Sequence, residues 1–109
     1  MNPEKIAKLK KFDAAEYLET AEDIALYLDI AFEENDPERI AVALGTVARA
    51  KGMTEVARNA GVTREALYKA LSPKGDPKLG TLVGVFKALG LKLSVQPVND
   101  NNSFTQERA

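Results

Sequence analysis

The chain contains no cysteine, no histidine and no tryptophan. Without cysteine it has no disulfide framework and no thiolate metal site. Because histidine is missing as well, the commonest zinc ligands are absent and we expect no structural metal. Histidine is also the commonest general base, and the sequence shows neither a nucleophile–base pair nor a phosphate-binding loop. We therefore expect neither an enzyme nor a cofactor.

Long apolar runs are missing too. No run approaches the length that would span a bilayer, and the first residues, Met-Asn-Pro-Glu-Lys, form no apolar signal region. These two absences predict a cytoplasmic protein without a membrane partner. The length of 109 residues suits one domain, and the hydrophobic share of 45% and the charged share of 28% are typical of a soluble globular chain.

Charge is distributed unevenly along the chain. Residues 45–78 hold seven Lys or Arg against three Asp or Glu, a net charge of +4, whereas residues 1–44 hold five bases against eleven acids, a net charge of −6. A basic island in an acidic chain is typical of a surface that contacts phosphates. The overall pI near 5.5 argues against coating of nucleic acid without regard to sequence. Specific DNA binding through a small patch fits better.

Residues 53–71 lie in this island and read as two short helices joined by a tight turn. Thr54 is expected to cap the first helix and Thr63 the second, because a threonine hydroxyl can accept an unpaired amide proton of the opening turn. Gly61 is placed where the chain must leave the first helix in the left-handed conformation. A small alanine, Ala57, precedes it by four residues. This spacing is that of a helix-turn-helix motif.

The second helix of this pair has two faces. Leu67, Ala70 and Leu71 are spaced as the buried face, so four side chains project away from it: Arg64, Glu65, Tyr68 and Lys69. An ordinary helical hairpin with polar residues outside has the same spacing, but the local positive charge favours DNA binding. Arg64 is the best candidate to bind guanine. Phosphate contacts are expected from the bases nearby, Arg58, Lys69, Lys74 and Lys78.

Three longer helices are predicted around this pair, over residues 20–35, 36–52 and 77–90. The first opens with a capping box at Thr20 and Asp23, and the other two with an Asp-Pro pair, at 36–37 and at 76–77. The predicted fold is therefore mostly α, a five-helix repressor-like domain.

Residues 91–95 alternate apolar and polar side chains and are expected to form a short strand. A lone strand needs a mate, so we expect Leu91, Leu93 and Val95 to pair with the same strand of a second subunit in a homodimer. The predicted organisation is a flexible basic arm over residues 1–12, a single domain over 13–98 and a disordered tail over 99–109.

Several blocks of the sequence resemble one known family. They are Tyr17-Leu18, Tyr27-Leu28, Ala43-Leu44-Gly45, the block from Ala48 to Met53, Ala57, Gly61-Val62, the block from Arg64 to Ser72 and the block from Ala88 to Leu93. The chain is similar over about residues 11–95 to the addiction-module antidote proteins, HigA-like antitoxins that carry a phage-repressor (XRE-type) helix-turn-helix. The block from Ala48 to Ser72 is the specific part of this resemblance.

The resemblance implies a bacterial antitoxin with two tasks. It would neutralise a RelE/HigB-like RNA-cleaving toxin, and it would bind its own operator as a dimer to repress transcription. The recognition-helix positions of the family fall on Thr63, Arg64, Glu65, Tyr68 and Lys69. Repressor-like domains often have glutamine at the start of the first motif helix, where this chain has Met53-Thr54, so Thr54 would contact a phosphate instead. The alternative is a stand-alone prophage-type regulator without a toxin partner.

The surface that binds the toxin is harder to place from the sequence. A toxin that binds RNA should be basic, so charge complementarity favours the acidic residues 12–36. Phe12, Tyr17 and Leu18 are the expected anchors, with packing in the core as the other use of each side chain.

Overall fold

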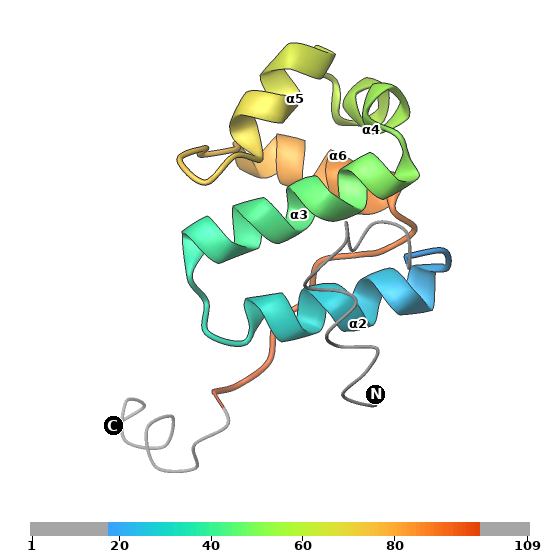
Figure 1. Cartoon of the computed structure of the whole chain (residues 1–109). Coiled ribbons are helices and arrows are strands. Elements are labelled where there is room, and N and C mark those ends of the chain that lie inside the picture. The colour runs from blue at the N-terminus through green and yellow to red at the C-terminus, as the bar shows by residue number, and fades with distance from the viewer. Residues whose placement is uncertain (1–17, 99–109) are drawn as a thin grey trace, which may run out of the picture.

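The computed structural model describes residues 18–98, and this part of the chain folds into five helices (Figure 1). They are α2 (Ala21–Phe32), α3 (Pro37–Lys51), α4 (Met53–Ala60), α5 (Arg64–Ala70) and α6 (Leu79–Ala88). The mostly helical prediction is therefore confirmed. The predicted arm over residues 1–12 and tail over 99–109 lie outside the described residues.

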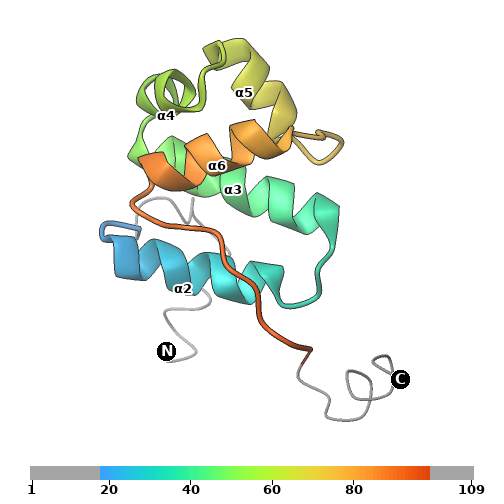
Figure 2. The same ribbon diagram turned by 180° about the vertical axis from the view of Figure 1, so that it is seen from behind.

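The helices are arranged in three tiers. α4 and α5 lie at one end of the molecule, α3 and α6 in the middle, and α2 at the other end, as the front and back views agree (Figures 1 and 2). α6 packs on α4, and α3 contacts both α2 and α4. The middle tier thus lies between the acidic helix α2 and the pair α4–α5.

Two of the predicted helix starts are confirmed in detail. At α2 the Asp23 amide donates to the Thr20 hydroxyl at 3.0 Å and the Thr20 amide donates to the Asp23 carboxylate at 3.3 Å, which completes the capping box. At α3 the Glu38 amide donates to Asp36 Oδ1 at 3.2 Å, and Pro37 occupies the first helical position. Local side-chain chemistry therefore determines where both helices begin.

The core is built from one apolar face of each helix. Five of its side chains are fully buried, namely Leu44, Val47, Val56, Leu67 and Val85. The rings of Phe32 and Phe86 meet edge to face with centroids 6.2 Å apart, which joins the end of α2 to α6. This single cluster fixes the position of α5 through Leu67.

The start of α6 differs from the prediction. The helix begins at Leu79 rather than at Pro77, and its N-cap residue, Lys78, makes no side-chain cap hydrogen bond. The backbone at Lys78 is still extended, with φ −69° and ψ 158°, so the loop continues past Pro77. The Asp-Pro pair that opens α3 therefore does not open α6.

The strand predicted over residues 91–95 is not formed, and no strand is present among residues 18–98. The Leu91 amide, which would begin such a strand, donates instead to the Phe86 carbonyl at 2.8 Å and closes the end of α6. Leu91 packs against the core, whereas Leu93 and Val95 are exposed. Alternating side chains are not sufficient for a strand, because a strand needs a neighbouring backbone to pair with.

Candidate nucleic-acid interface

The pair α4–α5 begins at a glycine shared between two helices. Gly52, with φ 122°, is both the C-cap of α3 and the N-cap of α4. Its amide donates to the Ala48 carbonyl at 2.8 Å, and its carbonyl accepts from the Val56 amide at 3.0 Å. The prediction that Thr54 caps α4 is therefore wrong, because the helix has already begun at Met53. Thr54 lies exposed in the first turn.

The turn between α4 and α5 follows the prediction. Gly61 adopts the left-handed conformation, with φ 74° and ψ 28°, and ends α4. Thr63 then caps α5, since its hydroxyl accepts from the Ala66 amide at 3.0 Å. Val62, between them, packs against the core. The two caps fix the direction in which α5 leaves the turn.

Two close backbone approaches hold the pair against the middle tier. A Cβ atom built on Gly84 of α6 would lie 2.5 Å from the Ala60 Cα at the end of α4. A Cβ built on Gly45 of α3 would lie 2.9 Å from the carbonyl oxygen of Leu71, just after α5. Only glycine allows these approaches, so α3 and α6 together determine the position of α5.

α5 buries one face and exposes the other, as expected. Leu67 is fully buried and Leu71 nearly so. The outward face carries the four predicted side chains, all exposed: Arg64, Glu65, Tyr68 and Lys69. The helix therefore presents a short row of polar and basic groups that its packing does not require.

More basic side chains surround this face. Arg58 comes from the last turn of α4, Lys74 from the loop after α5 and Lys78 from the start of α6, and all three are exposed. Within residues 18–98, neither these three nor Arg64 and Lys69 form an ion pair with an acidic side chain. The salt bridge found there instead joins Arg39 and Glu34, at 3.6 Å. The bases near α5 thus remain available to an anion outside the described part of the chain.

Arg64 and Tyr68 interact along the face of α5. The guanidinium carbon of Arg64 lies 5.6 Å from the centroid of the Tyr68 ring, one helical turn further on, which is the geometry of a cation–π contact. Tyr68 remains 44% exposed. The tyrosine therefore supports the arginine from one side and leaves the other donors of the guanidinium accessible.

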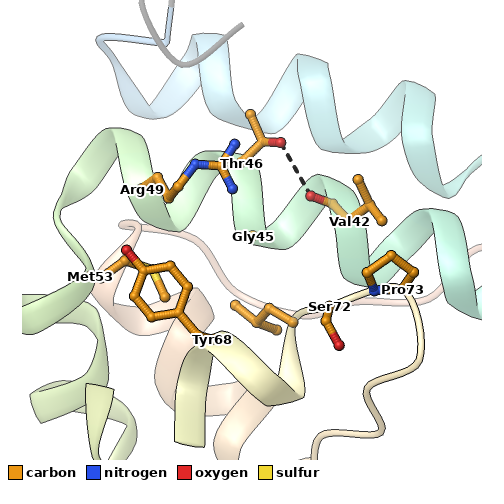
Figure 3. A pocket seen from close by; sticks show the side chains of 9 residues that line it. Val42, Gly45, Thr46, Arg49, Met53, Tyr68, Ser72 and Pro73 are labelled. Atoms are coloured by element: carbon orange, nitrogen blue, oxygen red, sulfur yellow. Dashed lines mark hydrogen bonds between the residues drawn. The ribbon is translucent and has the colours of Figure 1, made fainter. Parts of the chain in front are cut away.

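A groove of about 290 Å³ lies beside Tyr68, between α3 and α5 (Figure 3). It is lined by Val42, Gly45, Thr46, Arg49, Met53, Tyr68, Leu71, Ser72 and Pro73. The figure shows the Tyr68 ring beside Met53, with Arg49 of α3 across the opening. The sequence singles out two of these residues, Tyr68 on the outward face of its helix and Arg49, near the end of its helix, as a candidate phosphate contact. Gly45, a small residue within an apolar stripe, is the one sequence signal of this opening.

Those of the predicted toxin and dimer residues that the structure describes lie away from this interface. Leu18, just before α2, is half-buried and packs against the core. Phe12 and Tyr17 lie outside the described residues. Leu93 and Val95 are 41% and 96% exposed, in the segment that follows α6 toward the α2 end of the molecule (Figure 1). Among the predicted site residues within 18–98, only those expected to bind DNA are grouped on and around α4 and α5.

The described part is thus a small, mostly helical protein with basic side chains around one short helix pair. The chain belongs to a family described as "Probable addiction module antidote protein", whose sequence model matches residues 8–97. An addiction module antidote is an antitoxin, and an antidote implies a toxin as its partner.

One relative is an uncharacterized protein of Haemophilus influenzae (strain ATCC 51907 / DSM 11121 / KW20 / Rd). It is 49% identical over 89 residues, which cover 82% of this chain and 92% of the relative. No solved structure matches the chain. In the part of the chain that the structure describes, no helix is long and apolar enough to cross a membrane.

Proposed function

We propose that this protein is the antitoxin of a type II toxin–antitoxin module, HigA-like, with a phage-repressor (XRE-type) helix-turn-helix formed by α4 and α5. It neutralises a RelE/HigB-like RNA-cleaving toxin in the cytoplasm and represses its own gene pair by binding the operator. The DNA-binding part of this proposal rests on the outward face of α5. Its basic side chains are exposed, and no described carboxylate pairs with them.

In this proposal α5 enters the major groove of operator DNA. Arg64 at its first position donates in a bidentate manner to a guanine, and the contact with Tyr68 orients it for this role. Glu65 accepts from a cytosine amino group or holds Arg64 in position. Tyr68 contacts a thymine methyl group or a phosphate with the part of its ring that is not packed.

Phosphate contacts come from the residues around α5 and orient the protein without reading sequence. They are made by Thr54, Arg58, Lys69, Lys74 and Lys78. Thr63 does not need to contact DNA with its side chain, because its hydroxyl already caps α5. In this arrangement its backbone, at the end of the turn, lies close to the major groove of the DNA.

The protein acts as a homodimer in this proposal. Leu93 and Val95 are exposed and remain available for contact with the second copy. The two copies of α5 then lie about 34 Å apart and read a palindromic site.

The DNA-binding half is tested with a gel shift on duplex DNA from the region upstream of the gene, titrated with salt. We expect specific binding that weakens steeply as salt rises, since phosphate contacts release counterions. The double variant Arg64→Ala/Lys69→Ala should lose binding. The matched control Lys87→Ala removes an exposed base from α6, outside the interface, and should bind as the wild type does. If the double variant binds the DNA as tightly as Lys87→Ala does, the assignment of α5 as the DNA-binding helix is refuted.

The antitoxin half is tested by co-expression of the chain with the product of the neighbouring gene. Co-purification of a stable complex, and relief of growth arrest caused by that product alone, is the expected result. If the neighbouring product neither binds nor arrests growth while the gel shift succeeds, the protein is a stand-alone prophage-type regulator.

A further inference from the structure

The outer face of α2 exposes two large aliphatic side chains, Leu26 and Ile30. They are 58% and 64% exposed and lie four residues apart, so they are neighbours on one side of the helix. Leu26 is two positions from both Ile24 and Leu28, whose side chains are buried in the core. At about 100° per residue this places Leu26 on the side of the helix opposite the core. Both side chains therefore leave more than half of their surface in contact with solvent.

Acidic side chains surround this apolar pair. Glu22, Asp23, Asp29 and Glu33 are exposed on the same helix or at its end. Residues 19–38 contain eight carboxylates and no lysine or arginine. The next base along the sequence, Arg39, forms its salt bridge with Glu34. The surface is therefore an apolar centre with a negative rim, which is the composition of a docking surface rather than of an ordinary solvated helix.

We propose that this α2 face, defined by Leu26 and Ile30 with Glu22 and Glu33, is the surface that binds the toxin; the assignment rests on the proposed function. An enzyme that cleaves RNA must attract a polyanion and therefore carries a basic surface. Such a surface complements the negative rim, and the two aliphatic side chains fill its apolar part. A second copy of this chain that docks through the same face does not fit, because the two negative rims would then face and repel each other.

The position of α2 adds a consequence for the assembly. α2 lies at the opposite end of the molecule from α4 and α5, with α3 and α6 between them (Figures 1 and 2). A toxin on the α2 face leaves the candidate DNA interface uncovered. The same antitoxin molecule can therefore bind toxin and operator together.

The test uses the full chain and the purified product of its neighbouring gene as the probe, with calorimetry as the measurement. The double variant Leu26→Ala/Ile30→Ala should lose toxin affinity by about tenfold or more, because both central side chains are truncated. Alanine suits an exposed helix position, so folding should be preserved. The matched control is Leu79→Ala, which truncates a leucine that is 71% exposed on α6 and should leave the affinity unchanged. Operator binding should be unchanged in both variants.

A second variant tests the charged rim. Glu22→Gln/Glu33→Gln should slow association with the toxin several-fold at low salt, and the difference from the wild type should shrink at high salt. If Leu26→Ala/Ile30→Ala binds toxin as tightly as the wild type, the α2 face is not the docking surface, although the chain remains an antitoxin. If the wild type itself binds no toxin, the proposed function fails first. A wild-type dimer that becomes monomeric in the variant would assign the face to a second copy.

Discussion

The approach of α6 to α4 at Gly84 allows a quantitative prediction. A Cβ on residue 84 would lie 2.5 Å from the Ala60 Cα and 2.9 Å from the Asn59 carbonyl oxygen. Carbon atoms in ordinary contact are about 3.5–4.0 Å apart, so Gly84→Ala must move α4 away by about 1 Å. The atoms in the way are backbone, which cannot rotate aside as a side chain can. Overpacking of this kind destabilises by about 1–3 kcal/mol, and we expect the upper half of that range.

Helix propensity acts in the opposite direction. Alanine is favoured over glycine inside a helix by about 1 kcal/mol, so the net loss expected for Gly84→Ala is about 1–2 kcal/mol in the free energy of unfolding. In a domain of this size each kcal/mol lowers the melting temperature by about 4–8 °C. Urea unfolding followed by circular dichroism measures the free energy of unfolding, and thermal unfolding measures the melting temperature.

The same helix offers a matched control at Gly80, where a built Cβ would meet nothing within 4 Å. Gly80→Ala gains propensity without a clash and should stabilise the protein by a few tenths of a kcal/mol, up to about 1. The two substitutions are chemically identical, and only the neighbouring backbone differs. If Gly84→Ala proves as stable as Gly80→Ala, the close approach of α6 to α4 does not exist and the reasoning about how α5 is positioned is refuted.

Two further predictions concern the helix pair itself. Thr63→Ala removes the cap of α5 and should lower the free energy of unfolding by about 1 kcal/mol. Thr54→Ala removes no cap hydrogen bond and should change this free energy by less than about 0.5 kcal/mol. Equal losses for the two variants in urea unfolding would contradict this prediction. Arg64→Ala should weaken operator binding by about 1–3 kcal/mol and relax the base specificity at one position of the operator. Lys74→Ala should weaken binding to every sequence equally. Titration of both variants against a set of operator variants measures the difference. A uniform loss for Arg64→Ala would make it a phosphate contact.

Much of the fold follows from short-range signals in the sequence. Thr20 with Asp23, Asp36 with Pro37 and Thr63 each mark a helix start that the structure reproduces, because a cap depends on a few neighbouring atoms. Ile24 and Leu28 are spaced four residues apart, as on one face of a helix, and both are buried. Periodicity also identifies the outward residues of α5 in advance.

The wrong predictions concern features that depend on contacts with distant parts of the chain. Thr54 has the right chemistry for a cap, but Gly52 ends α3 and starts α4 in one residue, which leaves no place for a threonine cap. Residues 91–95 alternate as a strand does, yet the described chain has no extended segment to pair with them. The groove beside Tyr68 depends on how closely α3 approaches α5. Gly45 permits this close approach, but the sequence alone does not show that it occurs.

The three-tier arrangement has a consequence for how variants should behave. Leu44 and Val47 of α3 are fully buried in the cluster shared with α2 and α4, so truncating either should impair toxin binding and operator binding together. Surface changes should separate the two activities, since Leu26 and Arg64 lie on helices at opposite ends of the molecule. A variant at Leu26 that lost operator binding while keeping its stability would mean that one surface serves both partners. The division of charge between an acidic α2 and the basic segment 45–78 argues for two surfaces, because a single patch could not complement both a basic protein and a polyanionic duplex.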